Sequence, residues 1–141
     1  MQLFPWKDEY NVGVLLVDQQ HRHLVSLLNQ LHAVMKNGSR QAEVRNVLND
    51  LVAYTKFHFG SEEKLMAECG YPALEQHARK HRAMEQRVAS FVQELSANSA
   101  TTAPRLMAFL KEWLSRHILE TDKEMGRFYS ALQPTNRHVG A

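Results

Sequence analysis

Hydrophobic side chains recur every three or four residues along most of the chain, with polar residues between them. This period is typical of amphipathic helices, whereas strands alternate every second residue. Glycine, proline and short polar clusters divide the pattern into four stretches. We expect helices from Asp18 (as N-cap) to Asn37-Gly38, from after Ser39 to Cys69, from Pro72 in the first turn to about Ser96, and from Pro104 to about Leu132.

Short connections join the four stretches, the longest being the small, polar segment Ala97–Ala103, which we expect to be a loop. Four helices of this length with short connections predict an all-α fold, an up-down-up-down four-helix bundle. Residues 1–17 contain Pro5 and Gly13 and are expected to form an irregular N-terminal arm. A chain of 141 residues suits one domain. We therefore predict a bundle over 1–133 and a flexible tail over 134–141.

Each expected helix has one apolar seam, and ionisable side chains interrupt all four seams. The interruptions are His21 in the first helix, His58 and Glu62 in the second, His77 and His81 in the third, and His117 in the fourth. A lone histidine on such a seam is usually a hydrogen-bonded core residue. A buried, unpaired ion, however, costs several kcal/mol, and the seams carry no lysine or arginine as a counter-charge. The occurrence of all these ionisable residues on the seams of one bundle therefore favours a metal cluster over separate hydrogen-bonded histidines.

A change of register in the fourth helix adds a seventh member to the set. Asp122 lies five residues after His117, which in a regular α-helix places the two side chains about 140° apart. Beyond His117 the apolar positions Ile118 and Met125 continue the earlier seam slipped by one residue, with Asp122 between them. One extra residue in a single turn, a π-bulge, restores both faces. We predict such a bulge between His117 and Asp122.

The seven side chains predict a two-metal centre. A structural zinc site usually contains several cysteines, and Cys69 is alone. Imidazoles with carboxylates suit first-row ions that include iron and manganese. Five imidazoles, two bridging carboxylates and a shared hydroxide would fill all but one position of two octahedral ions, which leaves room for a small diatomic. Of the other histidines, His23 lies off its seam, His32 lies about 16 Å along the axis from His21, and His138 belongs to the tail.

The motifs that carry these residues resemble those of the hemerythrin family in its bacterial, single-domain form. The resemblance extends from Trp6 to about Tyr129, and no ligand position is missing. The order and spacing of the motifs make it specific. They are Asp18-Gln19-Gln20-His21, His58-Phe59-Gly60-Ser61-Glu62-Glu63, Gly70-Tyr71-Pro72 ahead of His77 and His81, and Trp113 through His117-Ile118 to Asp122.

The resemblance implies reversible O₂ binding by two non-haem iron ions (Fe²⁺/Fe³⁺) with a bridging oxo or hydroxo group. One iron, coordinatively saturated, would be held by His77, His81 and His117. The other, held by His21 and His58, would keep the open position. Glu62 and Asp122 would bridge the two. Neighbours of these residues in helical register are candidates for the wall of the O₂ pocket, namely Phe59, Trp113 and Ile118.

Binding is favoured over catalysis, so we do not expect an enzyme. Carboxylate-rich di-iron enzymes use Glu-x-x-His pairs, and the sequence contains none. We expect O₂ storage or delivery to an oxygen-consuming enzyme. Two alternatives stay open: an O₂ or redox sensor that acts through a separate partner, and a protein that handles iron, peroxide or NO.

Composition narrows the partners further. The formal charge is +2 and no basic run is present, which argues against nucleic acid. No stretch approaches a membrane span or a secretory signal, and a single cysteine, Cys69, fits a reducing cytoplasm. The oligomeric state is left open, with a monomer slightly favoured.

Overall fold

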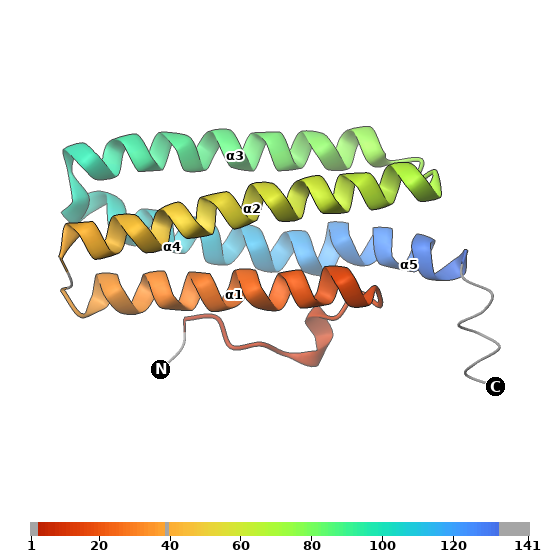
Figure 1. Cartoon of the computed structure of the whole chain (residues 1–141), viewed down its shortest axis with the longest axis horizontal. Helices are drawn as coiled ribbons and strands as arrows, with labels where there is room; N and C mark the ends of the chain where they lie inside the picture. Colours follow the sequence, from red (N-terminus) through yellow and green to blue (C-terminus); the bar gives the residue numbers. More distant parts are fainter. Residues whose placement is uncertain (1–2, 39, 133–141) are drawn as a thin grey trace.

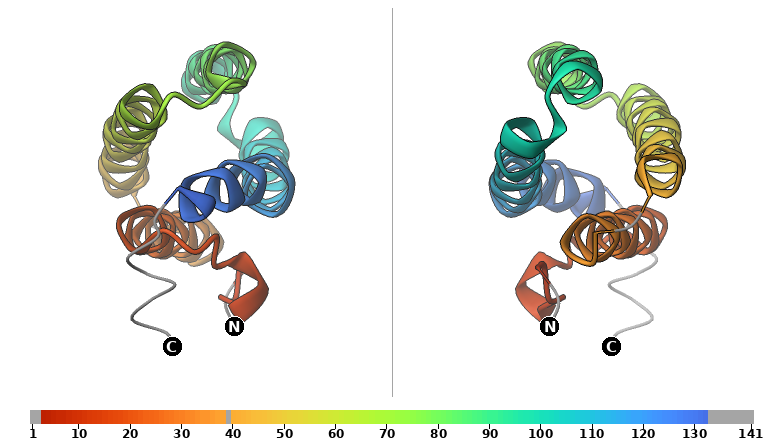
Figure 2. Two further views of the ribbon diagram at one scale, coloured as in Figure 1. Left: turned by 90° about the vertical axis from the view of Figure 1, so that its right-hand side faces the viewer. Right: turned by 90° about the vertical axis from the view of Figure 1, so that its left-hand side faces the viewer.

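Four long helical rods lie side by side in the computed structural model, which describes residues 3–38 and 40–132 (Figure 1). Along the bundle, α1 packs against α2, α2 against α3, and α3 against α4, while α4 also contacts α1. Figure 2 views the bundle from its two ends and shows the helices around a common centre. The predicted all-α four-helix bundle is confirmed. Its elements are η1 (Asp8–Tyr10), α1 (Leu15–Lys36), α2 (Gln41–Cys69), α3 (Leu74–Ala97), α4 (Ser99–Arg116), the π-helical segment η2 (His117–Asp122) and α5 (Lys123–Ala131).

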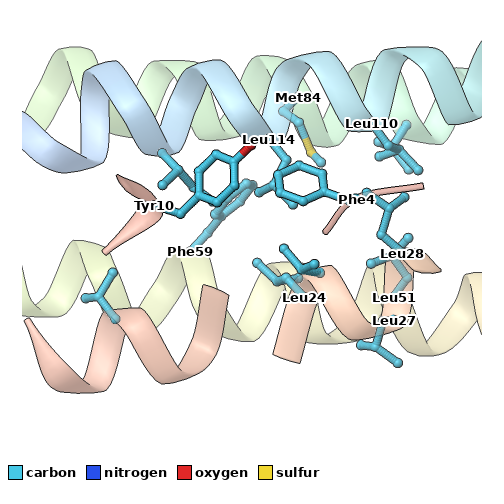
Figure 3. Close-up of a cluster of buried hydrophobic side chains, with 14 of the residues drawn as sticks. Phe4, Tyr10, Leu24, Leu27, Leu28, Leu51, Phe59, Met84, Leu110 and Leu114 are labelled. Atoms are coloured by element: carbon cyan, nitrogen blue, oxygen red, sulfur yellow. The ribbon is translucent and has the colours of Figure 1, made fainter. Parts of the chain in front are cut away.

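The N-terminal arm is tied to the bundle by hydrogen bonds and by buried aromatic rings. The backbone N–H of Phe4 donates to Oδ1 of Asn29 at 2.8 Å, and the Asn29 side-chain amide donates to the Phe4 carbonyl at 3.0 Å. The rings of Phe4 and Tyr10 are buried with their centroids 5.2 Å apart (Figure 3). The arm therefore forms part of the hydrophobic core.

Two expected helix starts are wrong by a few residues. The first helix begins at Leu15, so Asp18 lies in its first turn instead of capping it. The Asp18 carboxylate turns back to accept hydrogen bonds from the backbone N–H groups of Val12 and Gly13, at 2.7 and 3.3 Å. Pro72 lies ahead of the third helix, which begins at Leu74. The second helix ends at Cys69 as expected, before Gly70 with a φ of 69°.

The loop expected over Ala97–Ala103 is wrong. The third helix ends at Ala97, the fourth begins at Ser99, and Pro104 lies inside the fourth helix. Pro104 is the sixth residue of this helix, so its missing N–H removes one internal backbone hydrogen bond. Thr102 is buried, and its N–H donates to the Asn98 carbonyl at 3.2 Å, so the segment is held as helix.

Apolar side chains from all four rods fill the bundle centre (Figure 3). Phe59 reaches into this core from α2, beside Met84 of α3 and Leu114 of α4. Within the described ranges, no helix combines the length and the hydrophobicity that a bilayer span requires. The predicted tail, 134–141, falls outside the described residues.

Candidate metal centre

The structure brings all seven predicted site residues together in the bundle interior. Each of the seven residues is at most 5% exposed. They form two overlapping groups whose ligand atoms lie within 4.8 Å of one another. One group contains Glu62, His77, His81, His117 and Asp122, and the other contains His21, His58, Glu62 and Asp122.

The Glu62 carboxylate divides its two oxygens between the two groups of imidazoles. Oε1 lies 2.7 Å from Nε2 of His77 and 3.1 Å from Nε2 of His81. Oε2 lies 3.2 Å from Nε2 of His58 and 3.6 Å from Nε2 of His21. A carboxylate in this position can present one oxygen to each of two neighbouring cations.

Asp122 repeats this division from the opposite rod. Its Oδ1 lies 2.9 Å from Nε2 of His77 and 3.1 Å from Nε2 of His117. Its Oδ2 lies 2.9 Å from Nε2 of His21. Taken together, the two carboxylates place three imidazoles (His77, His81 and His117) on one side and two (His21 and His58) on the other.

A π-helical segment aims both His117 and Asp122 at the centre. It runs from His117 to Asp122, and the predicted bulge is thereby confirmed. The wider turn places residues five apart on one face, whereas a regular α-helix would rotate them away from each other. Ile118 and Met125 on the same rod remain fully buried, so the apolar seam is also kept.

The carboxylates are ionised in the metal-free site. Burial alone would raise the pKa of Glu62, but contacts with imidazoles, those of His21 and His58 among them, hold it well below its usual value. Burial and the charge of Glu62 act in the same upward direction on Asp122. Contacts with His117 and His21 outweigh them, so the pKa of Asp122 is also lowered.

The imidazoles respond unequally to the same carboxylates. Burial favours neutral His21 and His77, but their close contacts with the Asp122 and Glu62 carboxylates outweigh burial and raise both pKa values to about 9. Burial dominates at His117 and lowers its pKa. Without metal, protonated His21 and His77 therefore balance the negative charges of Glu62 and Asp122.

Two polar residues outside the predicted set orient two of the imidazoles. Nδ1 of His58 lies 2.7 Å from Oε1 of Gln20, and Nδ1 of His81 lies 2.9 Å from Oε2 of Glu63. In both cases an oxygen accepts the Nδ1–H, which leaves the Nε2 lone pair directed at the centre. Sequence reasoning gave neither Gln20 nor Glu63 a role, although each stands next to a predicted ligand.

Aromatic rings cover two of the imidazoles. Phe59 stacks on His81 with centroids 3.8 Å apart and 5° between the planes, and Trp113 stacks on His117 at 4.3 Å and 12°. Phe59 and Ile118 are buried and Trp113 is half-buried, so all three residues expected near the pocket lie close to the centre or in the core beside it.

The remaining histidines lie apart from the centre or outside the described residues. His23 is exposed, and its ring packs on that of Tyr54 with centroids 4.3 Å apart. His32 is half-buried and borders a cavity at the other end of the bundle. His138 lies outside the described residues.

The donor set fits a pair of iron ions. All four oxygens of Glu62 and Asp122 are buried, and no residue in the described part of the chain gives them a well-aligned hydrogen bond. Such oxygens need cations, and imidazole nitrogen with carboxylate oxygen is a set that iron accepts.

Comparison with known proteins agrees with this chemistry. The family described as hemerythrin HHE cation binding domain matches residues 12–129. A bacteriohemerythrin from Stenotrophomonas maltophilia is 37% identical over 123 residues, which cover 87% of this chain and 79% of the relative. One from Clostridium acetobutylicum is 30% identical over 126 residues, which cover 86% and 98%. A crystal structure of wild-type hemerythrin superposes with a TM-score of 0.79 at 29% identity, covering 91% of this chain and 98% of that one. The chain therefore belongs to the hemerythrin family, whose O₂-binding members carry a pair of non-haem iron ions.

Proposed function

We propose that this protein binds O₂ reversibly at its di-iron centre, for storage or for delivery to an oxygen-consuming enzyme. The observation that carries the proposal is the shared division of the two buried carboxylates. Glu62 and Asp122 each turn one oxygen toward one set of imidazoles and the other oxygen toward the second set. Two cations held side by side, each with its own imidazoles, account for that arrangement.

The ligand assignment follows the same division. Glu62 and Asp122 would contribute to both ions. His77, His81 and His117 would hold one iron, while His21 and His58 would hold the other. The second iron would thus have one imidazole fewer, and O₂ would be expected to bind there. When bound, the iron pair supplies the electrons that reversible O₂ binding requires.

The protein's own residues keep this centre rigid and dry. Gln20 and Glu63 fix the tautomers of His58 and His81, and a fixed tautomer strengthens the imidazole as a ligand. The rings of Phe59 and Trp113 stack on imidazoles and exclude water from their faces. Exclusion of water protects a bound gas from proton-driven side reactions.

The space beside the centre suits a diatomic better than an organic substrate. A small apolar cavity of about 20 Å³ is bordered by Phe59, Trp113, Thr55 and neighbouring aliphatic side chains. A single water needs roughly 10–15 Å³ by this kind of measure. Such a space supports the binding of a small gas, so we infer a binding protein rather than an enzyme.

The setting in the cell is part of the same proposal. We place the protein in the cytoplasm, where the thiol of Cys69 would stay reduced. The recipient of the O₂ would be an oxygen-consuming enzyme.

A metal analysis combined with an oxygen titration tests the proposal. We expect two irons per chain, no colour in the reduced protein without air, visible absorption on admitting O₂, and loss of that absorption under argon. Irreversible oxidation without a stable oxygenated form would instead favour the handling of iron, peroxide or NO.

Two histidine variants test which residues bind iron, independently of O₂ binding. His77→Ala should lower the iron content while leaving a folded bundle, because a smaller residue is tolerated better than an unpaired charge. His23→Ala is the matched control, because His23 is exposed on α1, and it should keep both irons. Full iron content in the His77→Ala protein would contradict the assignment.

A further inference from the structure

A second, much larger cavity lies at the opposite end of the bundle from the metal centre. Its volume is about 790 Å³, within the range of small-molecule sites. It is an open hollow bordered by the C-terminal parts of α1 and α3 and the N-terminal parts of α2 and α4, at the end that faces the viewer in the right panel of Figure 2. Arg45, on its wall, stands about 20 Å along α2 from His58, at 1.5 Å per residue. The cavity is therefore separate from the iron site.

The wall of this cavity is mainly apolar and adaptable. Each of the four rods contributes aliphatic or thioether side chains, and the two methionines can adjust to the shape of a flexible ligand. Leu48 and Met107 are buried at the base of the wall. The apolar members are Met35, Val44, Leu48, Val92, Leu95 and Met107.

Every charged side chain on the wall is positive. Lys36, Arg45 and Lys111 are exposed, and His32 adds a fourth basic group. No aspartate or glutamate lines the cavity. Within the described part of the chain, no ion pair involves Lys36, Arg45 or Lys111. An apolar hollow thus carries three cations without partners.

We propose that this cavity binds an amphipathic anion of the fatty-acid type. The acyl chain occupies the apolar hollow, where its burial supplies most of the affinity, and the carboxylate pairs with Lys36, Arg45 or Lys111 at the edge. A cationic amphiphile would meet three like charges, and an uncharged one would leave these cations unpaired. The charge of the wall thus selects a negative head group among ligands with the same tail.

Calorimetric titration of the iron-loaded protein with dodecanoate, kept below its micellar concentration, tests this proposal. We expect saturable binding with one dodecanoate per chain. Dodecanol should bind at least tenfold more weakly, and dodecyltrimethylammonium should not bind measurably. No heat of binding with dodecanoate, or equal binding of dodecanol, would overturn the proposal.

Variants locate the ligand. Ala103 is half-buried on the wall, so Ala103→Phe should fill the hollow and weaken binding at least tenfold. The triple variant Lys36→Gln, Arg45→Gln, Lys111→Gln should weaken it by a similar factor. The matched control removes two exposed cations outside the cavity wall, Lys64→Gln with Arg127→Gln, and should leave it unchanged.

The iron content and the melting temperature of each variant show that it is folded. Since Ala103→Phe alters packing and the triple variant alters only surface charge, one of the two remains informative if the other fails to fold. Dodecanoate that binds both folded variants as tightly as the unmodified protein would overturn the proposal.

Discussion

Glu63 accepts a hydrogen bond from Nδ1 of His81 at 2.9 Å, and the same carboxylate oxygen pairs with the guanidinium of Arg82. The contact joins α2 to α3 directly outside the metal centre. His58 has a corresponding partner in Gln20, but there the acceptor is a neutral amide oxygen. The two proposed irons therefore differ in the charge of the groups that support their imidazoles. His81 has an anionic partner, whereas His58 has a neutral one.

Removal of the Glu63 carboxylate should weaken iron binding. Partners of this kind typically contribute about 10–100-fold to metal affinity. We expect Glu63→Leu to lose iron to a competing chelator at least tenfold faster than the unmodified protein. Glu63→Gln, which keeps an acceptor oxygen, should show a smaller effect.

The control for Glu63 is another glutamate paired with an arginine. Glu75 pairs with Arg79 on the exposed face of α3, and exposed pairs contribute little. Glu75→Gln should therefore release iron at the unmodified rate. Equal rates for the Glu63 and Glu75 variants would show that the carboxylate behind His81 does not support the metal.

The stability of the metal-free protein should depend on pH through the buried imidazoles. The pKa values of His21 and His77 are raised to about 9, above the value near 6.5 of an unfolded chain. Their contribution to the free energy of unfolding is therefore complete below pH 6.5 and is lost as pH rises through 9. Glu62 and Asp122 have lowered pKa values, so their contribution is lost as pH falls below about 4.

Urea unfolding at several pH values measures this dependence. The metal-free protein should be most stable between about pH 4 and 6.5 and should weaken toward pH 9. The iron-loaded protein should show a flatter profile over the same range, because metal-bound imidazoles must already be neutral. A metal-free protein that gains stability from pH 6.5 to 9 would contradict the assignment of protons to His21 and His77.

The sequence was sufficient to locate the polar cluster because its members interrupt apolar seams. A side chain on a seam must face the core, so the seam position alone predicts that His58 and Glu62 are buried. The slip of one residue after His117 likewise has few structural solutions, and the π-helical segment is one of them. In these cases the local pattern determines the tertiary position.

The supporting residues and one loop could not be predicted in this way. Glu63 lies beside the seam, and its role depends on the approach of α3, 18 residues away along the chain. Proline is common at a helix start, so the sequence predicts one at Pro104, but the burial of Thr102 favours helix ahead of it. Both outcomes depend on packing between rods, which the periodicity of one segment does not contain.

Deletion of Glu120 should convert the π-helical segment into regular α-helix and keep iron. Glu120 is exposed, and its removal would leave His117 and Asp122 four residues apart, on one face of an α-helix. We expect unchanged iron content and unchanged helical circular dichroism. Deletion of Ala89, in a regular turn of α3, is the comparison and should lower the melting temperature, because it rotates the seam beyond it by about 100°. Loss of iron on deleting Glu120 would show that the wide turn itself is required.

Gly126 should be intolerant of any side chain. A Cβ built at this position would lie 2.2 Å from the backbone carbonyl oxygen of Val12, which belongs to the N-terminal arm. Backbone cannot move aside as a flexible side chain can, so Gly126→Ala must push the arm away from α5. We expect a loss of about 2–4 kcal/mol in the free energy of unfolding by urea, comparable to other overpacked cores.

Gly60→Ala provides the opposite case on the same scaffold. Gly60 is also helical, but nothing lies within 4 Å of its built Cβ, so the substitution should stabilise the protein by about 0.5–1 kcal/mol through helix propensity alone. The two variants make the same chemical change in helical positions and differ only in what the methyl group meets. If Gly126→Ala were as stable as Gly60→Ala, the arm could not be packed against α5 through Val12.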